Sequence, residues 1–314
     1  MIKALFTYDY GPERMALVRQ LGYEVLLASE KNLTATADIA QTEVLVCYAP
    51  FKTLDIGLMP RLRWIQLSSI GVDQVPAALA QKARVTVTNN RGGYSVPIGE
   101  WIVHKVLEIY KQSRYFYENQ QQRTWQLTTE ILELGGRRVG FIGTGTIAQE
   151  AARRLAAFDM ELTGFNTTGR SAPHFTQCFP ITLLDRWIHR FDVVVVAVPG
   201  TPETEGLLNR AMLRRMKPSA VLINVSRGSV LDEGALVELL REGRFMGVAL
   251  DVFQQEPLSP DNPLWGFSRV YVTPHNCWVS ERRNDRRFEI ILENLRRYKA
   301  GEALLNQVNL EKGY

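Results

Sequence analysis

Three segments in the second half of the chain each place a charged or titratable side chain just after an apolar run. They are "INVSRGSV" with Arg227, "ALDVFQQEPL" with Glu256 and "YVTPHNCW" with His275. Because ligands bind beyond the carboxyl ends of parallel strands, we expect these three side chains to converge there. A permanent cation, a carboxylate and an imidazole together can polarise a carbonyl group and give it a proton.

A glycine-rich turn in "VGFIGTGTIAQEAARRL" has the pattern strand, turn, helix. Gly143 permits the tight turn, Gly145 lets the backbone approach a pyrophosphate, and the small Ala148 lets the helix pack closely on the strand. The pyrophosphate then lies at the positive end of the helix, which begins near Thr146 and Ile147. The pattern predicts a dinucleotide site, and a connecting turn without a ligand is the alternative.

The stretch "GFNTTGR" follows the next expected strand, where a dinucleotide-binding unit normally has an acid that binds the ribose hydroxyls. This chain has the neutral Asn166 there. Thr167 and Thr168 can donate hydrogen bonds, and Arg170 adds a fixed cation that suits a phosphate. The stretch therefore predicts NADP(H) in preference to NAD(H). An ordinary polar turn in an NAD site that tolerates Asn is the alternative.

Short β-rich runs alternate with helical patterns along the whole chain, which is typical of parallel sheets with crossover helices. The expected strands are residues 2–7, 24–28, 44–47, 64–67 and 85–89, and then 138–142, 161–165, 193–198, 221–225, 247–251 and 271–273. Between these two sets we expect one long helix over about 97–122. A last helix should end near Gly301. The fold class is α/β, with two doubly wound parallel-sheet domains.

Composition excludes several other classes of protein. The 314 residues suggest two domains, and the net charge of +4 comes largely from scattered Arg-Arg pairs, which argues against a nucleic-acid partner. The three cysteines form no CxxC pattern, so we expect neither a disulfide framework nor a metal site. No apolar run approaches the length of about 18 residues that spans a bilayer. We expect a cytoplasmic protein without a membrane partner.

Several motifs together resemble the D-isomer-specific 2-hydroxyacid dehydrogenases, a family that includes glyoxylate/hydroxypyruvate reductases and 3-phosphoglycerate dehydrogenases. Besides the segments quoted above, they are "SSIGVDQV", "VTNNRGGYSVPIGEW" and "PGTPETEGLLN", and the resemblance covers roughly residues 64–313. It implies a Rossmann cofactor domain, 99–285, inserted into a flavodoxin-like substrate domain, 1–98 and 286–314. It also implies an NAD(P)-dependent oxidoreductase that acts on a small 2-keto or D-2-hydroxy acid, and a homodimer.

The resemblance also assigns roles to single residues. His275 corresponds to the general acid/base of the family and Glu256 to the carboxylate that orients its imidazole. Arg227 corresponds to the residue that polarises the carbonyl and holds the substrate carboxylate. Ile70 and Gly71 match the loop whose backbone amides bind that carboxylate.

Further matches concern the cofactor. Asp251 matches the contact to the nicotinamide carboxamide. Val198, Pro199 and Thr204 match the wall near adenine and ribose, although packing and turn formation are the alternative for each.

Two departures from the family pattern leave the substrate open. One is Asn166, and the other is Asn276-Cys277-Trp278, where the family usually has small residues after its histidine. Glyoxylate, hydroxypyruvate and phosphohydroxypyruvate are the candidates. A rival from another class is a nucleotide-sensing binding protein of the same fold that turns over no metabolite.

Overall fold

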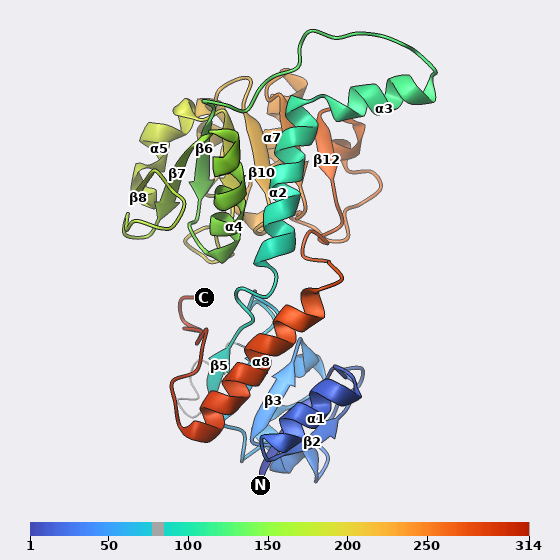
Figure 1. Cartoon of the computed structure of the whole chain (residues 1–314), viewed down its shortest axis with the longest axis vertical. Coiled ribbons are helices and arrows are strands. Elements are labelled where there is room, and N and C mark those ends of the chain that lie inside the picture. Colours follow the sequence, from blue (N-terminus) through green and yellow to red (C-terminus); the bar gives the residue numbers. More distant parts are fainter. Residues whose placement is uncertain (77–84, 314) are drawn as a thin grey trace. The chain divides into compact units, whose positions relative to one another are not determined.

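The computed structural model describes residues 1–76 and 85–313, and the chain forms two compact units. One unit comprises Met1–Tyr94 and Ser280–Tyr314, and the other comprises Ser95–Val279 (Figure 1). The chain passes between the units after residues 94 and 279, slightly earlier than the predicted boundaries after residues 98 and 285. The second unit is thus inserted into the first.

The first unit contains a five-stranded parallel sheet with the order β2-β1-β3-β4-β5. Its strands are β1 (Ile2–Phe6), β2 (Tyr23–Leu27), β3 (Val44–Cys47), β4 (Trp64–Leu67) and β5 (Thr86–Thr88). This is the flavodoxin-like order, in which the chain reverses its winding direction between β1 and β3. The predicted strands and their class are confirmed.

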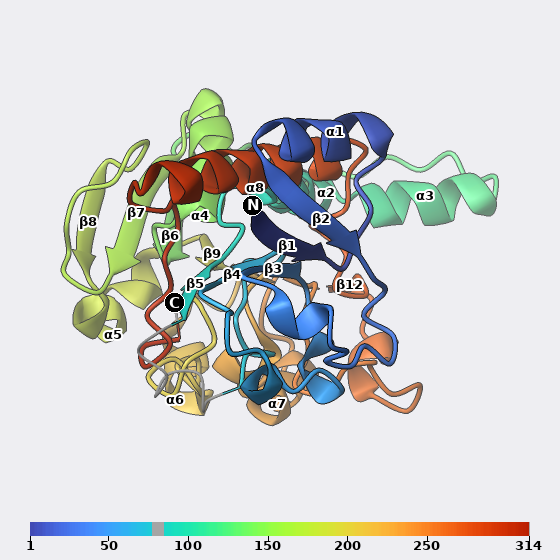
Figure 2. The ribbon, with the colours of Figure 1, turned by 90° about the horizontal axis from the view of Figure 1, so that it is seen from below.

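Two helices far apart in the sequence cover one face of this sheet. They are α1 (Pro12–Gln20) and α8 (Arg283–Ala300), which lie side by side (Figure 2). Phe288 and Ile291 of α8 pack with Phe6 and Trp64 of the sheet in one buried cluster. The helix ends as predicted at Gly301, whose φ of 69° is the left-handed conformation that glycine adopts freely.

The second unit contains a seven-stranded parallel sheet with the order β12-β11-β10-β9-β6-β7-β8. Its strands are β6 (Arg138–Ile142), β7 (Glu161–Asn166), β8 (Gln177–Pro180), β9 (Val193–Val196), β10 (Val221–Asn224), β11 (Gly247–Leu250) and β12 (Val270–Val272). The winding reverses between β6 and β9, which is the Rossmann arrangement. Strand β8 was not predicted, because "QCFP" has neither an apolar run nor alternation and ends in a proline, which suits only an edge strand.

Helices cover both faces of the seven-stranded sheet. One buried cluster joins the sheet to α5 (Leu184–Trp187), α6 (Arg210–Arg215) and α7 (Glu233–Arg241). On the other face, α2 (Ser95–Tyr110) packs closely on α4 (Thr146–Leu155). A Cβ added to Gly99 would lie 3.0 Å from the backbone nitrogen of Ala151, so glycine is needed at this crossing.

The prediction of one long helix over 97–122 is wrong. The helix ends at Tyr110, and Gln112 has a left-handed φ of 52° before α3 (Ser113–Gln121) begins. Helix α2 buries Ile109 and Tyr110 at its end, whereas α3 buries no residue. Once no core remains to cover, the chain changes direction, and α3 projects away from the body of its unit (Figure 1).

Candidate active site

Three neighbouring parallel strands carry the predicted catalytic residues just beyond their carboxyl ends. Arg227 follows β10, Glu256 follows β11 and His275 follows β12. The structure brings two of them into direct contact, since Nδ1 of His275 lies 2.7 Å from Oε2 of Glu256. This imidazole–carboxylate pair is the geometry that a general acid/base requires of its orienting partner.

Glu256 is itself held by its own loop. Its second oxygen, Oε1, accepts a hydrogen bond of 3.0 Å from the backbone N–H of Phe253. The side chains of His275 and Glu256 are 41% and 35% exposed, so a ligand can reach the pair. Within the described part of the chain, Nε2 of His275 makes no hydrogen bond, which leaves that nitrogen for proton exchange with a ligand.

Arg227 lies in a turn that packs against the loop of Glu256. A Cβ added to Gly228 would lie 1.9 Å from the carbonyl carbon of Phe253, so the two loops touch through their backbones. The stem of Arg227 packs on Gly200, and its carbonyl oxygen accepts a hydrogen bond of 3.1 Å from Asn224. The backbone of this turn is therefore fixed at the same sheet edge as the His275–Glu256 pair.

The two glycines of the dinucleotide turn are needed for different reasons. Gly143 has a φ of 98°, and an added Cβ would lie 2.5 Å from the carbonyl oxygen of Ala197. The fold itself therefore requires glycine at this position. An added Cβ at Gly145 would meet no atom within 4 Å, so packing within the chain does not require glycine there. An open, side-chain-free position at the start of α4 is what a pyrophosphate needs.

Helix α4 begins at that glycine. Gly145 is its N-cap, and Thr146 and Ile147 form the first turn, where backbone N–H groups have no partner within the helix. The hydroxyl of Thr146 pairs with that of Ser95 at 2.8 Å, which ties the start of α2 to this turn. Among the described residues, the N–H groups of Thr146 and Ile147 have no acceptor, so they are available to an anion.

Asn166, at the end of β7, uses its whole side-chain amide to shape the turn that follows. Its Oδ1 accepts from the backbone N–H groups of Thr168 at 3.2 Å and Gly169 at 2.7 Å. Its Nδ2 donates to the Thr144 hydroxyl at 3.1 Å and to the carbonyl of Arg170 at 2.8 Å. Asn166 therefore joins this turn to the dinucleotide turn. The exposed side chains beside it, Thr167, Thr168 and Arg170, are the ones available to a ligand.

The loop after β9 contains the three residues expected near adenine and ribose. Val198 is half-buried and Pro199 is exposed. The hydroxyl of Thr204 donates to the carbonyl of Pro199 at 2.7 Å and accepts from the N–H of Thr201 at 2.9 Å. The structure therefore gives Thr204 a role in forming this turn.

Asp251 is completely buried and binds the loop that carries His275. Its Oδ1 accepts from the Thr273 hydroxyl at 2.6 Å and from the Asn276 N–H at 3.1 Å, and both oxygens lie 3.2 Å from the Cys277 nitrogen. The sequence did not predict that Thr273 donates a hydrogen bond to Asp251. Burial, followed by the charge of Asp251, raises the pKa of the Cys277 thiol, so this cysteine stays neutral and unreactive.

In the first unit, Ile70 and Gly71 lie in the loop after β4. Their carbonyl oxygens are occupied, because Ile70 accepts from Asn89 and Gly71 from the hydroxyl of Ser69, both at 2.8 Å. Among the residues that the structure describes, the N–H groups of Ile70 and Gly71 donate to no partner. Two such amides in one turn suit a carboxylate, and the role of Ile70 and Gly71 in substrate binding stays a prediction.

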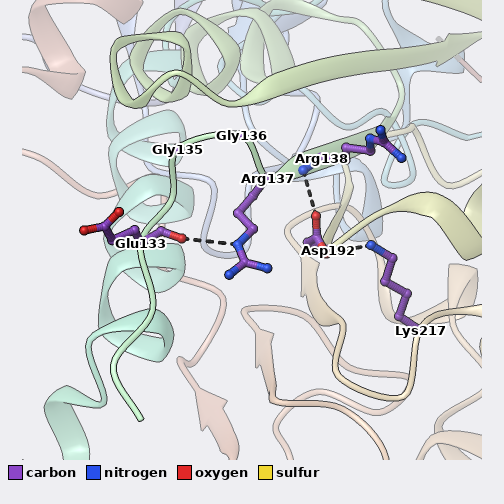
Figure 3. Close-up of a pocket in the computed structure, with 7 residues that line it drawn as sticks. All are labelled: Glu133, Gly135, Gly136, Arg137, Arg138, Asp192 and Lys217. Carbon is purple, nitrogen blue, oxygen red and sulfur yellow. Dashed lines mark hydrogen bonds and ion pairs between the residues drawn. The ribbon is translucent and has the colours of Figure 1, made fainter. Parts of the chain in front are cut away.

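A polar hollow of about 380 Å³ lies elsewhere, at the amino ends of β6, β9 and β10 in the second unit (Figure 3). Lys217 forms an ion pair with Asp192 at 2.7 Å, and the same carboxylate accepts from the N–H of Arg138 at 2.9 Å. These charges are already satisfied within the protein, and the hollow lies at the sheet edge opposite to the one where doubly wound folds bind ligands. We therefore place the active site at the carboxyl edge.

Residues 1–76 and 85–313 contain neither a candidate metal cluster nor a candidate membrane-spanning helix. No three His, Cys, Asp or Glu side chains come together in a group that suits a metal ion. None of the helices has both the length and the apolar character needed to cross a membrane.

Comparison with known proteins agrees with this geometry. Residues 103–277, more than half of the chain, match the family described as D-isomer specific 2-hydroxyacid dehydrogenase, NAD binding domain. A glyoxylate reductase of Thermofilum pendens is 33% identical over 284 residues, which cover 86% of this chain and 83% of that one.

Two solved structures are similar over almost the whole length. A D-isomer specific 2-hydroxyacid dehydrogenase of Xanthobacter autotrophicus in complex with NADPH has a TM-score of 0.83 at 28% identity and covers 99% of both chains. An NADPH-dependent glyoxylate/hydroxypyruvate reductase of Sinorhizobium meliloti in complex with NADP has a TM-score of 0.82 at 26% identity and covers 100% of both. The chain belongs to the D-isomer-specific 2-hydroxyacid dehydrogenases, enzymes that act on CH–OH donors with a nicotinamide cofactor.

Proposed function

We propose that the enzyme reversibly reduces a small 2-keto acid to the D-2-hydroxy acid and prefers NADP(H). The contact of 2.7 Å between His275 and Glu256 is the observation that carries this proposal. When bound, the nicotinamide supplies the hydride that reduces the carbonyl carbon. His275 gives its Nε2 proton to the carbonyl oxygen, and Glu256 stabilises the imidazolium from which that proton comes.

Arg227 holds the substrate carboxylate in this proposal. A guanidinium is permanently charged and presents a planar fork of donors, which matches a carboxylate and also polarises the neighbouring carbonyl. In the first unit, the N–H groups of Ile70 and Gly71, which have no acceptor among the described residues, are two donors that also suit a carboxylate. Because the Arg227 cation pairs with a carboxylate, it supports a 2-keto acid as the substrate over a simple ketone.

The preference for NADP(H) rests on the turn after β7. Asn166 leaves the position of the usual acid uncharged, so nothing there repels a 2′-phosphate. Thr167, Thr168 and Arg170 are exposed beside it and supply donors and one cation. The NADPH-dependent reductase of S. meliloti, which is similar over its full length, supports the same choice.

Glyoxylate and hydroxypyruvate are the substrates that we favour. Relatives with these activities in their names match most of this chain. Phosphohydroxypyruvate is the alternative, because relatives named D-3-phosphoglycerate dehydrogenase also match. Cytoplasmic location stays a prediction from the cysteine pattern.

We also propose a homodimer formed through an arm that comprises α3 and the segment after it, residues 113–127. Tyr117, Trp125 and Leu127 of this arm are 62%, 103% and 82% exposed. Such a concentration of large apolar side chains on a surface marks an association site.

Light scattering should give twice the mass of the chain for the native enzyme. The double variant Trp125→Arg with Leu127→Arg should give the mass of a single chain. A native protein of single-chain mass would contradict the dimer.

The function is tested by steady-state rates for NADPH and NADH, each with glyoxylate, hydroxypyruvate and phosphohydroxypyruvate. We expect turnover with at least one keto acid and a higher kcat/KM for NADPH than for NADH. Turnover that prefers NADH would overturn the cofactor assignment. Tight binding of NADPH without turnover of any acid would favour the nucleotide-sensing protein.

A further inference from the structure

The backbone of His275 has an unusual conformation. Its φ is 50°, in the left-handed region that side chains other than glycine rarely adopt. Such a conformation costs free energy and persists only where the surrounding structure fixes it. Groups that contact the loop around His275 can hold this conformation in place.

Asp251 holds the amino-terminal side of this residue. Its carbonyl oxygen accepts a hydrogen bond of 2.8 Å from the N–H of His275 itself. Its buried carboxylate accepts from Thr273, Asn276 and Cys277, the residues on both sides of the histidine. One side chain without exposed surface thus binds the loop before and after the catalytic imidazole.

Trp278 holds the carboxyl-terminal side. Its indole Nε1 donates a hydrogen bond of 2.9 Å to the carbonyl oxygen of His275. The N–H, the carbonyl and the ring of His275 are therefore each bound, by Asp251, Trp278 and Glu256 respectively. A small residue at position 278 has no donor that could reach this carbonyl.

We propose that Asp251 and Trp278 are positioning residues that hold His275 in the left-handed conformation, with its Nδ1 on Glu256 and its Nε2 toward the substrate. The inference rests on the proposed acid/base role of His275. It departs from the role expected for Asp251 as a contact to the nicotinamide carboxamide, because the described partners of the carboxylate all lie in the His275 loop.

The test compares Trp278→Phe with a matched control, Trp265→Phe. Phenylalanine keeps an aromatic ring and removes the indole N–H with the rest of the five-membered ring, a loss of volume that the control variant shares. Trp265 also donates its N–H to a backbone carbonyl, that of Ser259 at 3.0 Å, but in a different loop. Loss of one hydrogen bond should lower kcat by roughly three- to tenfold in Trp278→Phe, with the dissociation constant of NADPH unchanged. Trp265→Phe should have the kcat of the native enzyme.

A readout that needs no turnover separates this inference from the proposed function. The chain has four histidines, so the imidazole signals can be followed by NMR in histidine-labelled protein. In Trp278→Phe the chemical shifts of the His275 imidazole should change, while those of His104, His174 and His189 stay the same. If the native enzyme reduces no keto acid, this result still tests whether Trp278 positions His275.

Asp251→Asn supplies the second test. It should lower kcat more than Trp278→Phe does and alter the His275 signals, with little change in NADPH binding. Unaltered His275 signals and native kcat in Trp278→Phe would overturn the role of Trp278. Weaker NADPH binding with native His275 signals in Asp251→Asn would show that Asp251 is a cofactor contact instead.

Discussion

Two loops at the carboxyl edge of the same sheet are built in opposite ways. In the loop after β12, the backbone and ring of His275 are bound on every side, by Asp251, Glu256 and Trp278. In the loop after β7, Asn166 fixes the backbone, but Arg170 and its neighbours extend into solvent. Proton transfer requires atoms fixed in place, whereas recognition of a phosphate tolerates flexible, exposed donors.

This difference predicts how the two loops respond to substitution. Changes in the His275 loop remove contacts that fix a reacting atom, so they should act mainly on kcat. Changes in the exposed loop remove a ligand contact and little internal packing, so they should act on KM for one cofactor and leave folding stability nearly unchanged.

The largest effect is expected for His275→Ala. Removal of the proton donor should lower kcat by about 10²–10⁴-fold, while NADPH still binds with native affinity. Stopped-flow or steady-state rates and fluorescence titration measure the two quantities. Native activity in this variant would remove the basis for the assignment of the site.

Arg227→Lys should come next. A lysine keeps the positive charge but lacks the planar fork, so kcat/KM for the keto acid should fall by at least about tenfold. The same rate measurements at varied keto-acid concentration give this value. An unchanged kcat/KM would mean that Arg227 does not hold the substrate carboxylate.

Arg170→Ala should have a smaller and selective effect. Loss of one charged hydrogen bond to a phosphate should raise KM for NADPH by about tenfold and leave KM for NADH unchanged. Arg186→Ala, which removes an exposed arginine from α5, is the control and should alter neither value. An equal change in KM for both cofactors would mean that the turn after β7 is an ordinary polar turn that does not select NADPH.

The smallest effect concerns Cys277. Because burial raises the pKa of this thiol, it stays protonated and should resist iodoacetamide at pH 8 with full retention of activity. Mass spectrometry of the labelled protein should find Cys178, which is only half-buried, modified first. Rapid labelling of Cys277 would show that the His275 loop opens readily and is less firmly held than its hydrogen bonds indicate.

Most of the fold could be predicted from the sequence because its signals are local. Buried parallel strands such as "VVVV" and "VLIN" are continuous apolar runs bounded by turns, and each appears as a strand in the structure. Strand β8 lacks that signal. The break at Gln112 has neither glycine nor proline to mark it, and it depends on where the core ends.

The candidate site was predictable in part. The order of Arg227, Glu256 and His275 after successive strands placed them at one edge, and the resemblance to a family supplied their roles. The role of Asn166 as a link between two turns was not predictable, because it depends on three hydrogen bonds to the irregular backbone of its own turn and one to the distant Thr144 hydroxyl. The bonds of Asp251 and Trp278 to the His275 loop depend in the same way on a conformation that residue types do not encode.

The most direct test of the central claim follows the hydride to the product. The enzyme is incubated with hydroxypyruvate and NADPH that carries deuterium on one or the other face of C4. We predict that one of the two deuterated forms transfers its deuterium to C2 of the D-hydroxy acid, and that His275→Ala slows this transfer. Formation of the L-product, or reduction without deuterium at C2 from either form, would contradict it.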